Sequence, residues 1–527
     1  MVITKKYLVV PINPYVTVKR IFLTCDEKLI FDFDARLDFV NPTCYQYVNV
    51  ERYIGRDIFI TSQPEIELNF SFSDEKIVHP RDTNNRPLAH FTAGHGWLND
   101  PNGLVQYNGV YHVFFQHNPA GVDWGNMTWG HAISKDLIHW EELDDAIFPD
   151  EEGSIFSGGA IMDYHNVSGL SPDGSPVMLA YYTAAGGDRE ISKNKPFTQC
   201  LTYSIDGGKT LKKYAGNPII GHIAGENRDP IVVYVAEMKM YVLSLFLDEH
   251  EYVLMCSDDL IHWKEFQRII APEDAECPNL ILLPVAGTNE KKWVFMGASD
   301  TYAVGAFKNG RYVPEQEFKH YYYHGTAGRT SYAAQAFTDE SGRAIRITWE
   351  NMRSPEASFW GQLGIPCEMS LKKVDDCYNL QTNPVQEFDD NCEIIHEIND
   401  GIVAVGDVLK VPLGKGAYDI SITVPSNSPD FAFNFFGIYF AARVSQNLFD
   451  FCGIDTPLKI SRSGSITIRI IVDTLGTEVF IDDGLVYSTS DFMPDFGIAR
   501  LVLSSSGKTD LNYSLKISKF ITEQDKG

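Results

Sequence analysis

The sequence of 527 residues contains no hydrophobic run long enough to cross a membrane. Its longest apolar stretches, such as residues 240–247, are far shorter than the roughly 20 apolar residues that a transmembrane helix requires. A secretory signal is also missing, because Pro11 and Pro14 interrupt the apolar run after Lys5 and Lys6, and no small-residue cleavage site follows. We therefore predict a cytoplasmic protein, with a secreted form whose signal has been removed as the alternative.

Basic residues are few compared with acidic ones. The chain has 44 Lys and Arg against 70 Asp and Glu, which gives a net charge of −26. A protein of this charge repels the phosphates of nucleic acids and anionic membrane surfaces, so neither is predicted as a partner. A neutral ligand such as a sugar is compatible with this charge.

Cysteine and histidine do not form the patterns of a metal site. The nine cysteines are an odd number and include no CxxC pair, which argues against a zinc site and against a disulfide framework. His95, His117 and His131 lack the spacing of a ligand set, and we interpret them as core or rim residues. The sequence therefore predicts no metal and no cofactor.

Amphipathic helical patterns of ten or more residues are nearly absent. Alternating apolar runs of four to eight residues, separated by Gly, Asn, Asp and Pro, cover almost the whole chain. Residues 106–115 illustrate the pattern, since Asn108 and Gly109 supply the two positive-φ positions of a tight hairpin turn. These features predict an all-β protein.

One short segment recurs along the chain. Residues 134–141, SKDLIHWE, return as residues 257–264, SDDLIHWK, and residues 204–210, SIDGGKT, are a degenerate third copy. Spacings of roughly 50 to 70 residues are those of successive blades in a β-propeller. We expect the aspartate to cap a turn, and Trp140 and Trp263 to pack between blades rather than to bind sugar. Residues 91–372 would hold about four to five such blades.

The length also requires more than one core. We predict a small N-terminal β-module over residues 1–85 and a catalytic propeller over residues 86–375. A polar, irregular stretch over residues 376–391 is predicted to be a linker. Short strands, such as residues 466–472 and 477–481, predict a C-terminal β-sandwich over residues 392–527.

Three acidic islands lie far apart in this β-rich sequence. They are residues 99–103, NDPNG, residues 228–230, RDP, and residues 276–278, ECP. A carboxylate at a Pro- or Gly-marked turn has a largely fixed orientation. Carboxylates that a fold brings together suit acid/base chemistry on a glycosidic bond. Taken singly, Asp100 could be an ordinary turn residue, Asp229 a partner of Arg228 in a surface ion pair, and Glu276 one glutamate among many.

The octapeptide at residues 96–103, GWLNDPNG, resembles the signature of glycoside hydrolase family 32, the invertases, levanases and inulinases. The likeness covers about residues 88–520 and keeps the family's order of motifs: FQHNP at 115–119, Trp124-Gly125, Trp129-Gly130-His131, Phe156-Ser157-Gly158, Arg228-Asp229-Pro230, Glu276-Cys277-Pro278, WGQLGIP at 360–366 and EVFIDDG at 478–484.

The resemblance implies a five-bladed β-propeller with a funnel-shaped site, followed by a β-sandwich. It also implies roles for the carboxylates, with Asp100 as the nucleophile, Glu276 as the acid/base and Asp229 as a third carboxylate that binds fructose hydroxyls. The substrate-binding residues that it implies, or that have a suitable neighbourhood, are Trp97, Asn99, Gln116, Trp124, Phe156, Ser157, Arg228, Tyr332 and Trp349.

We therefore predict a retaining glycosidase that releases terminal β-D-fructofuranosyl units from sucrose or fructans. A fructosyltransferase and an endo-acting fructanase remain alternatives, since acceptor choice depends on loop shape. An arabinan- or xylan-cleaving enzyme fits the octapeptide poorly, and a non-catalytic fructan-binding protein would be expected to lack one of the carboxylates. The sandwich or the N-terminal module could also mediate a homodimer.

Overall fold

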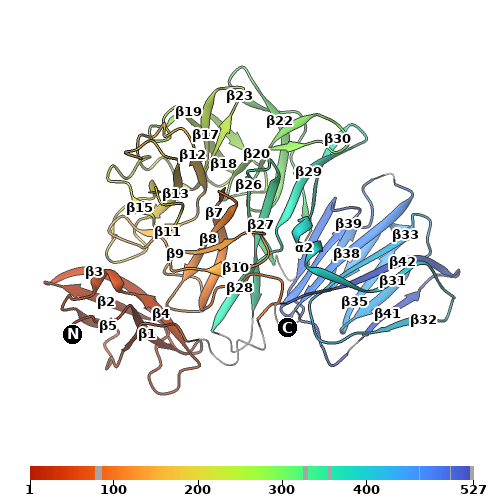
Figure 1. The fold of residues 1–527 in the computed structure, drawn as a ribbon, viewed down its shortest axis with the longest axis horizontal. Helices are drawn as coiled ribbons and strands as arrows, with labels where there is room; N and C mark the ends of the chain where they lie inside the picture. Colours follow the sequence, from red (N-terminus) through yellow and green to blue (C-terminus); the bar gives the residue numbers. More distant parts are fainter. Residues whose placement is uncertain (78–85, 324–329, 354–357, 462, 499, 523–527) are drawn as a thin grey trace.

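The computed structural model describes residues 1–77, 86–323, 330–353, 358–461, 463–498 and 500–522. Nearly all regular structure in these residues is β-strand, as predicted; the α-helix α2 (Gln386–Asp390) and the short 3₁₀ turns η1 (Glu51–Tyr53) and η2 (Val444–Gln446) are the helical elements that they contain. None of the described helices has the length and apolar character needed to span a bilayer. Three parts follow one another along the chain (Figure 1).

The first part is a small β-module, as predicted, made of two three-stranded sheets. Their orders are β4-β1-β6 and β3-β2-β5. The strands are β1 (Tyr7–Ile12), β2 (Lys19–Cys25), β3 (Lys28–Ala35), β4 (Cys44–Asn49), β5 (Phe59–Gln63) and β6 (Ser71–Ser73). Apolar side chains of both sheets form one core, which also takes in Ala120 and Val122 from the second part of the chain.

The second part consists of antiparallel sheets that follow one another around a centre. The strands are β7 (Gly96–Tyr107), β8 (Val110–Asn118), β9 (Thr128–Ser134), β10 (Trp140–Glu142), β11 (Ser154–Phe156), β12 (Ala160–Asp163), β13 (Val177–Ala185), β14 (Thr198–Ser204), β15 (Lys212–Lys213), β16 (Arg228–Val235), β17 (Met240–Asp248), β18 (Glu251–Ser257), β19 (Lys264–Ile270), β20 (Asn279–Pro284), β21 (Lys291–Met296), β22 (Thr301–Lys308), β23 (Arg311–Pro314), β24 (Lys319–His320), β26 (Ser331–Thr338), β27 (Ala344–Arg353), β28 (Phe359–Leu363), β29 (Cys367–Val374) and β30 (Cys377–Pro384).

A closed ring of inner strands lies at the centre of this part. Strand β7 contacts β12, β12 contacts β16, β16 contacts β20, β20 contacts β26, and β26 returns to β7. The ring closes where β28 pairs in parallel with the start of β7, so the first and last groups of strands form one nine-stranded sheet. Closure of this kind removes the free edges that an open array of sheets would leave.

The recurring sequence segment forms the same turn each time. The hydroxyl of Ser134 donates to Asp136 and that of Ser257 to Asp259, each at 3.0 Å, and in the third copy Ser204 donates to Asp206 at 2.6 Å. In the first two copies the aspartate also accepts hydrogen bonds from backbone N–H groups two and three residues further on. The aspartate therefore caps the turn, as predicted.

The third part is a two-sheet β-sandwich, as predicted. Its sheets are β25-β40-β39-β38-β33-β42-β31 and β32-β41-β34-β35-β36-β37. Strand β25 (Tyr322–Tyr323) comes from the second part of the chain and pairs in parallel with β40. The other strands are β31 (Cys392–Val403), β32 (Val408–Pro412), β33 (Tyr418–Pro425), β34 (Phe431–Phe435), β35 (Ile438–Arg443), β36 (Leu448–Phe451), β37 (Ile454–Pro457), β38 (Ser465–Asp473), β39 (Gly476–Ile481), β40 (Val486–Ser490), β41 (Arg500–Ser505) and β42 (Leu511–Phe520). Its core is aliphatic and phenylalanine-rich.

The stretch over residues 376–391 is not irregular, so this part of the sequence prediction was wrong. Residues Cys377–Pro384 form β30, which pairs with β29 along its whole length, and α2 occupies most of the rest. The polar side chains misled the prediction because β30 is an edge strand of its sheet, and an edge strand tolerates polar residues on its exposed positions.

A buried charged cluster joins the ring of sheets to the sandwich. His90 Nδ1 lies 2.9 Å from Asp473 Oδ2 and His90 Nε2 lies 2.9 Å from Glu478 Oε1, while Glu350 is 4.0 Å away. Burial lowers the pKa of His90, but the hydrogen bonds to the two carboxylates outweigh burial and raise it well above 6.5. A charged imidazole thus lies between carboxylates of the sandwich.

Replacing His90 with Leu should weaken this contact strongly. Two buried carboxylates would lose their cation, which destabilises a fold by about 3–5 kcal/mol. Because the pKa of His90 is raised on folding, its contribution is complete below about pH 6.5 and is lost as the pH rises through the raised value. The midpoint of denaturant unfolding at pH 6 measures the effect. His112→Leu is the control, since His112 is equally buried but its pKa is lowered to about 4 by burial; equal losses for both variants would contradict the charged pairing.

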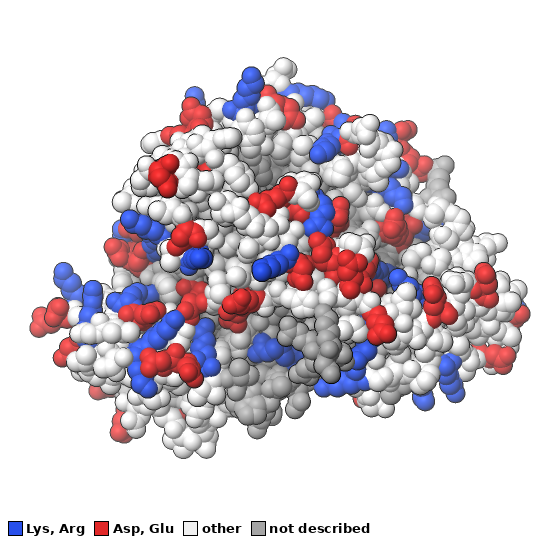
Figure 2. Space-filling model, in the orientation of Figure 1, with Lys and Arg blue, Asp and Glu red and all other residues white. Residues whose placement is uncertain are grey.

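Acidic and basic side chains are interspersed over the face shown in Figure 2, across all three parts of the chain. On this face the charged side chains form many small groups of both signs. Charge of this kind favours solubility and says little about the ligand.

Candidate active site

The three predicted carboxylates lie at one end of the inner strands. Asp100 lies in β7, Asp229 is the second residue of β16, and Glu276 lies three residues before β20 begins at Asn279. The strand register shifts by one residue between Leu98 and Pro101 in β7, and again around Asp229 in β16. Such β-bulges redirect side chains and are frequent beside active sites. Each aspartate therefore departs from the regular alternation of its strand.

Backbone conformation fixes these groups further. Asp229, Glu276 and Cys277 have φ values of 66°, 60° and 36°, which non-glycine residues adopt at a cost of order 1 kcal/mol each. Pro101 and Pro230 have no N–H to donate, so the ladder hydrogen bond is missing directly after each aspartate. The Asp-Pro pairs of the sequence thus mark the points where the ladder is interrupted.

Asp100 is held by neutral donors. Ser157 Oγ donates to Asp100 Oδ2 at 2.6 Å, and Asn99 Nδ2 donates to Asp100 Oδ1 at 2.9 Å. Trp97 Nε1 in turn donates to Asn99 Oδ1 at 2.8 Å and so orients the amide. Burial and the negative charge of Glu276 raise the pKa of Asp100, and the hydrogen bonds from Ser157 and Asn99 oppose this rise.

Cys277 connects the two aspartates. Its thiol sulfur lies 3.8 Å from Asp100 Oδ2 and 3.6 Å from Asp229 Oδ2, and its backbone N–H donates to Asp229 Oδ2 at 2.9 Å. Burial is the main cause that raises the pKa of Asp229 to about 7, with Glu276 and Asp100 adding to it and Arg228 opposing it. The carboxyl cluster therefore holds a proton at a pH at which isolated carboxyl groups would have lost it.

Both carboxylate oxygens of Glu276 accept hydrogen bonds. Arg228 Nη2 donates to Glu276 Oε1 at 2.7 Å, and Tyr332 Oη donates to Glu276 Oε2 at 2.6 Å. The guanidinium of Arg228 also lies 4.7 Å from the ring of Phe246, which supports it from the side. One carboxyl group with two oriented partners is well placed to donate and accept a proton at a fixed point.

Two further predicted residues carry free buried donors. Gln116 lies in β8 opposite the bulge that contains Asp100, and Trp349 pairs with Tyr332 across β26 and β27. Gln116 Nε2 and Trp349 Nε1 are buried and have no hydrogen-bond partner among the described residues. The Trp349 ring lies 5.6 Å from that of Trp97. Buried N–H groups are normally paired, so these two are available to a ligand.

The remaining predicted residues form the outer edge of the site. Trp124 is 59 % exposed and meets the ring of Phe156 edge-on at 5.9 Å. Phe156 precedes Ser157, and its other side contacts Phe197 at 5.6 Å. The structure thus places Trp124 at the rim, whereas Trp97, Asn99 and Gln116 are buried within the site.

Sequence reasoning missed two groups that support the carboxylates and one that extends the aromatic edge of the site. Thr183 Oγ1 accepts a hydrogen bond from the backbone N–H of Asp229 at 3.0 Å, and Tyr252 Oη donates to the carbonyl of Glu276 at 3.2 Å. Phe197 extends the aromatic edge. None belongs to a recurring motif, and Thr and Phe inside β-runs are expected as core residues, so the sequence gives no signal for them.

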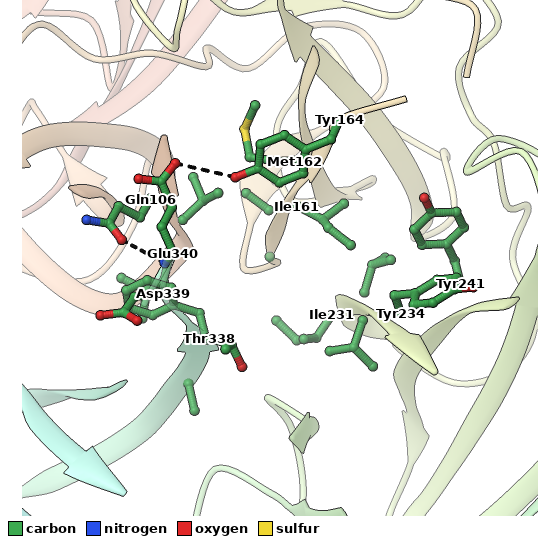
Figure 3. A pocket seen from close by; sticks show the side chains of 18 of the residues that line it. Gln106, Ile161, Met162, Tyr164, Ile231, Tyr234, Tyr241, Thr338, Asp339 and Glu340 are labelled. Carbon is green, nitrogen blue, oxygen red and sulfur yellow. Dashed lines mark hydrogen bonds between the residues drawn. The ribbon is translucent and has the colours of Figure 1, made fainter. Parts of the chain in front are cut away.

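A cavity of about 940 Å³ lies at the opposite ends of four of these inner strands, β7, β12, β16 and β26 (Figure 3). Aliphatic side chains such as Ile161 and Ile231 line it, with Tyr164, Tyr234 and Tyr241 among its polar residues. No predicted site residue lines this cavity. Gln335, which lines the cavity, links β26 to its neighbours, because its amide donates to Gly158 O and accepts from the Leu104 N–H, each at 3.0 Å.

One group of described side chains has the spacing of a metal site. His90, Glu350 and Glu478 each offer an atom within 4.8 Å of the others. Both ring nitrogens of His90 already lie within hydrogen-bond distance of carboxylates, and a protonated imidazole cannot ligate a metal. The group belongs to the interface with the sandwich rather than to the carboxylate site.

Replacing Asp229 with Asn should stabilise the protein at high pH. The pKa of Asp229 rises from 3.8 to about 7 on folding, so wild-type stability falls as the pH rises from about 4 to 7. About three pKa units correspond to at most about 4 kcal/mol. We expect the variant to gain stability at pH 8 and little at pH 5, as measured by denaturant unfolding.

Asp376→Asn is the matched control. Asp376 has φ 65°, close to that of Asp229, but its side chain is 98 % exposed. This control therefore measures how much an Asp-to-Asn substitution in the left-handed conformation changes stability when the side chain is exposed. If the gain of the Asp229 variant at pH 8, corrected by this control, were no larger than its gain at pH 5, the burial of a carboxylate with a raised pKa would be contradicted.

This sequence is similar to those of known carbohydrate-cleaving proteins. Residues 90–384 match the family model described as the glycosyl hydrolases family 32 N-terminal domain. The levanase of Bacillus subtilis is 31 % identical over 471 residues, which cover 79 % of this chain and 67 % of the levanase. The extracellular exo-inulinase of Aspergillus awamori is 29 % identical over 512 residues, covering 80 % of this chain and 92 % of the inulinase.

Solved structures show the same architecture. The crystal structure of the exo-inulinase from Aspergillus awamori superposes with a TM-score of 0.75 at 25 % identity, covering 83 % of this chain and 98 % of that one. A fructofuranosidase from Schwanniomyces occidentalis, solved in complex with fructose, superposes with a TM-score of 0.70 at 24 % identity and shares the fold. It also covers 83 % of this chain and 98 % of its own.

Proposed function

The chain belongs to glycoside hydrolase family 32, and we propose that it releases terminal, non-reducing β-D-fructofuranosyl units from sucrose and fructans. The observation that carries this proposal is the meeting of Asp100, Asp229 and Glu276 around Cys277 at one end of the inner strands. Three carboxylates from distant parts of the chain thus share one site, and hydrolysis of a glycosidic bond requires a pair of such groups.

The proposed reaction has two steps. Glu276 donates its proton to the oxygen of the leaving sugar while an oxygen of Asp100 attacks the anomeric carbon, which forms a fructosyl ester and breaks the glycosidic bond. In the second step Glu276 takes a proton from water, the water oxygen attacks the same carbon, and Asp100 leaves as the carboxylate. The net result is hydrolysis with retention of configuration.

Contacts within the site support this division of roles. Asp100 receives hydrogen bonds from Ser157 and Asn99, which stabilise the ionised form that attacks. Arg228 and Tyr332 fix the position of Glu276, the group that moves the proton. Asp229 lies beside both and is proposed to accept hydrogen bonds from fructose hydroxyls.

The free donors of Gln116 and Trp349 are proposed to complete the fructosyl pocket. Fructose presents hydroxyl groups on all sides, and a buried N–H without a partner gains a hydrogen bond when a hydroxyl binds. Trp97 would offer an apolar wall to the ring carbons. The pocket thus combines polar atoms in fixed positions with an indole face.

We also propose that residues 86–375 form a five-bladed propeller with the site in its funnel. The closed contacts of β7, β12, β16, β20 and β26 support one inner strand per blade. Residues 1–85 and 392–527 are proposed as separate domains. A funnel receives the end of a chain more readily than its middle, so exo-attack is proposed.

The relatives suggest candidate substrates, since they are named as levanases, invertases and exo-inulinases. Levan, sucrose and inulin are therefore the substrates to compare. A reducing compartment and a homodimer through the sandwich or the N-terminal module stay predictions.

The sugar products from sucrose, inulin and levan test the proposal. Fructose as the main product from a fructan, with equal amounts of fructose and glucose from sucrose, is expected. Less fructose than glucose from sucrose would indicate transfer to a sugar, and oligosaccharides from levan or inulin would indicate endo-attack. No release from any of the three would contradict the proposed function.

A further inference from the structure

The N-terminal module lies outside the region that matches the family model, which begins at residue 90. It nevertheless shares a hydrophobic core with the loop between β8 and β9, through Ala120 and Val122. The module and this loop therefore pack as one body. The module can therefore influence the position of the other residues in this loop.

Two polar contacts fix the same loop on either side of Trp124. Arg36 Nε donates to Asp123 Oδ2 at 2.6 Å, while Arg36 Nη1 donates to Val16 O inside the module at 2.7 Å. Asn126 accepts from the backbone N–H of Asp34 at 2.8 Å and donates to its carbonyl at 2.7 Å. The Asn126 amide thus pairs with the end of β3 as a strand neighbour would. Trp124 therefore lies between two residues that bind the module, and most of its own surface is exposed.

A second loop, residues 186–197, is attached to the module in the same way. The buried carboxylate of Asp32 accepts hydrogen bonds from the backbone N–H groups of Glu190 and Ile191, each at 3.1 Å. Arg189 is also buried; it donates to the Asp32 carbonyl and, through Nε, to Ser154 Oγ at 2.7 Å. This loop ends at Phe197.

The two loops carry the ends of one aromatic row. Trp124 contacts Phe156, and Phe156 contacts Phe197. The middle residue precedes Ser157, whose hydroxyl donates to Asp100. Asn99, Gln116 and Trp97 lie in the buried part of the site, whereas the row ends in the exposed Trp124. The row therefore leads outward from Ser157, toward the side on which the part of a substrate beyond the cleaved bond would lie. Apolar sugar faces pack on such rings.

We propose that the N-terminal module positions the acceptor side of the active site, and that Arg36 and Asn126 are positioning residues that set the preference for fructan oligosaccharides. The inference rests on the proposed function. It assigns to the module a role in substrate choice, since the module holds both loops that end the aromatic row. The ligand of the row is the leaving sugar chain, a neutral polyhydroxylated group.

Two substrates separate this role from a general structural one. A fructan tetrasaccharide extends over the aromatic row, whereas methyl β-D-fructofuranoside has a leaving group too small to reach it. We expect Arg36→Ala to lower kcat/KM for the tetrasaccharide about tenfold, mainly through KM, and to change it less than about twofold for the methyl fructoside. Arg36→Lys should recover most of the loss, because a lysine can still pair with Asp123.

Lys6→Ala is the matched control. Lys6 pairs with Asp144 and thus also joins the module to the sheets, and the side-chain exposures of the pair, 26 % and 42 %, are close to the 35 % and 45 % of Arg36 and Asp123. Its partner is not in either loop, so no change in the substrate ratio is expected. Asp123→Asn breaks the Arg36 pair from the other side and should reproduce the effect of Arg36→Ala if the latter protein is unstable.

A double variant gives the decisive outcome. If Arg36 acts through Trp124, then Arg36→Ala together with Trp124→Ala should lose no more than Trp124→Ala alone. Additive losses, or an equal loss on both substrates, would overturn the proposal. A wild-type protein that cleaves neither substrate would instead contradict the proposed function and would not bear on the module.

Discussion

Replacement of Asp100 by Asn is expected to lower kcat for fructose release from sucrose at least about 10³-fold. Asn has nearly the shape of Asp but cannot attack the anomeric carbon, and the first step of the proposed reaction depends on that attack. Removing a nucleophile from a comparable covalent mechanism costs several powers of ten. Initial rates of fructose formation measure the change.

The variant should remain folded. Burial raises the pKa of Asp100, so a neutral side chain at this position removes a buried charge rather than a stabilising one. Ser157 and Asn99 can still hydrogen-bond to the amide that replaces the carboxylate. A rate within tenfold of wild type, from a variant with unchanged unfolding, would rule out Asp100 as the nucleophile.

Replacement of Glu276 by Gln is expected to lower kcat on sucrose by about 10²–10⁴-fold, the usual contribution of a positioned acid or base. The leaving glucose would no longer receive a proton, while Arg228 could still donate to the amide oxygen. The loss should be smaller in the first step for p-nitrophenyl β-D-fructofuranoside, because nitrophenolate leaves without a proton. Pre-steady-state release of nitrophenol separates this step.

Azide provides an independent check on Glu276. Azide attacks the fructosyl ester without help from a base. It should therefore accelerate the second step in the Glu276 variant and yield a fructosyl azide. Glu226→Gln is the matched control, since Glu226 also lies near Arg228, at 3.8 Å, but its side chain is 72 % exposed. If azide had no effect and both substrates lost activity equally, Glu276 would not be the acid/base.

The sequence predicted the β-rich architecture well because local patterns carry it. Alternating runs, the hairpin at Asn108 and the repeated aspartate turn are short-range features, and each was found as predicted. The prediction for the stretch after β29 was wrong for the converse reason. Its strand β30 is specified by pairing with β29, which local polarity does not reveal.

The carboxylates could be singled out only as a set. Taken singly, each of Asp100, Asp229 and Glu276 has an ordinary structural explanation. Only the ordered series of motifs indicates that they are catalytic. The structure adds what no motif contains: the bulges at the two aspartates, the left-handed backbone of Glu276 and the thiol of Cys277 between two carboxylates. These features arise from strands that lie far apart in the chain.

Contacts between parts of the chain were the least predictable. Nothing in the sequence near Arg36 or Asp32 shows that the module reaches the loops that carry Trp124 and Phe197. The charged cluster around His90 likewise combines residues separated by more than 250 positions. Such pairings depend on how whole sheets dock, and only the folded chain contains that information.

The stereochemistry of transfer to methanol tests the central claim, a covalent fructosyl ester on Asp100, most directly. Wild-type protein would be incubated with sucrose in aqueous methanol, and the methyl fructoside formed would be identified by NMR before it is itself cleaved. Two displacements at one carbon retain configuration, so methyl β-D-fructofuranoside is the product that we predict. The methyl α-D-fructofuranoside would show a single displacement and would contradict the assignment of Asp100 as nucleophile.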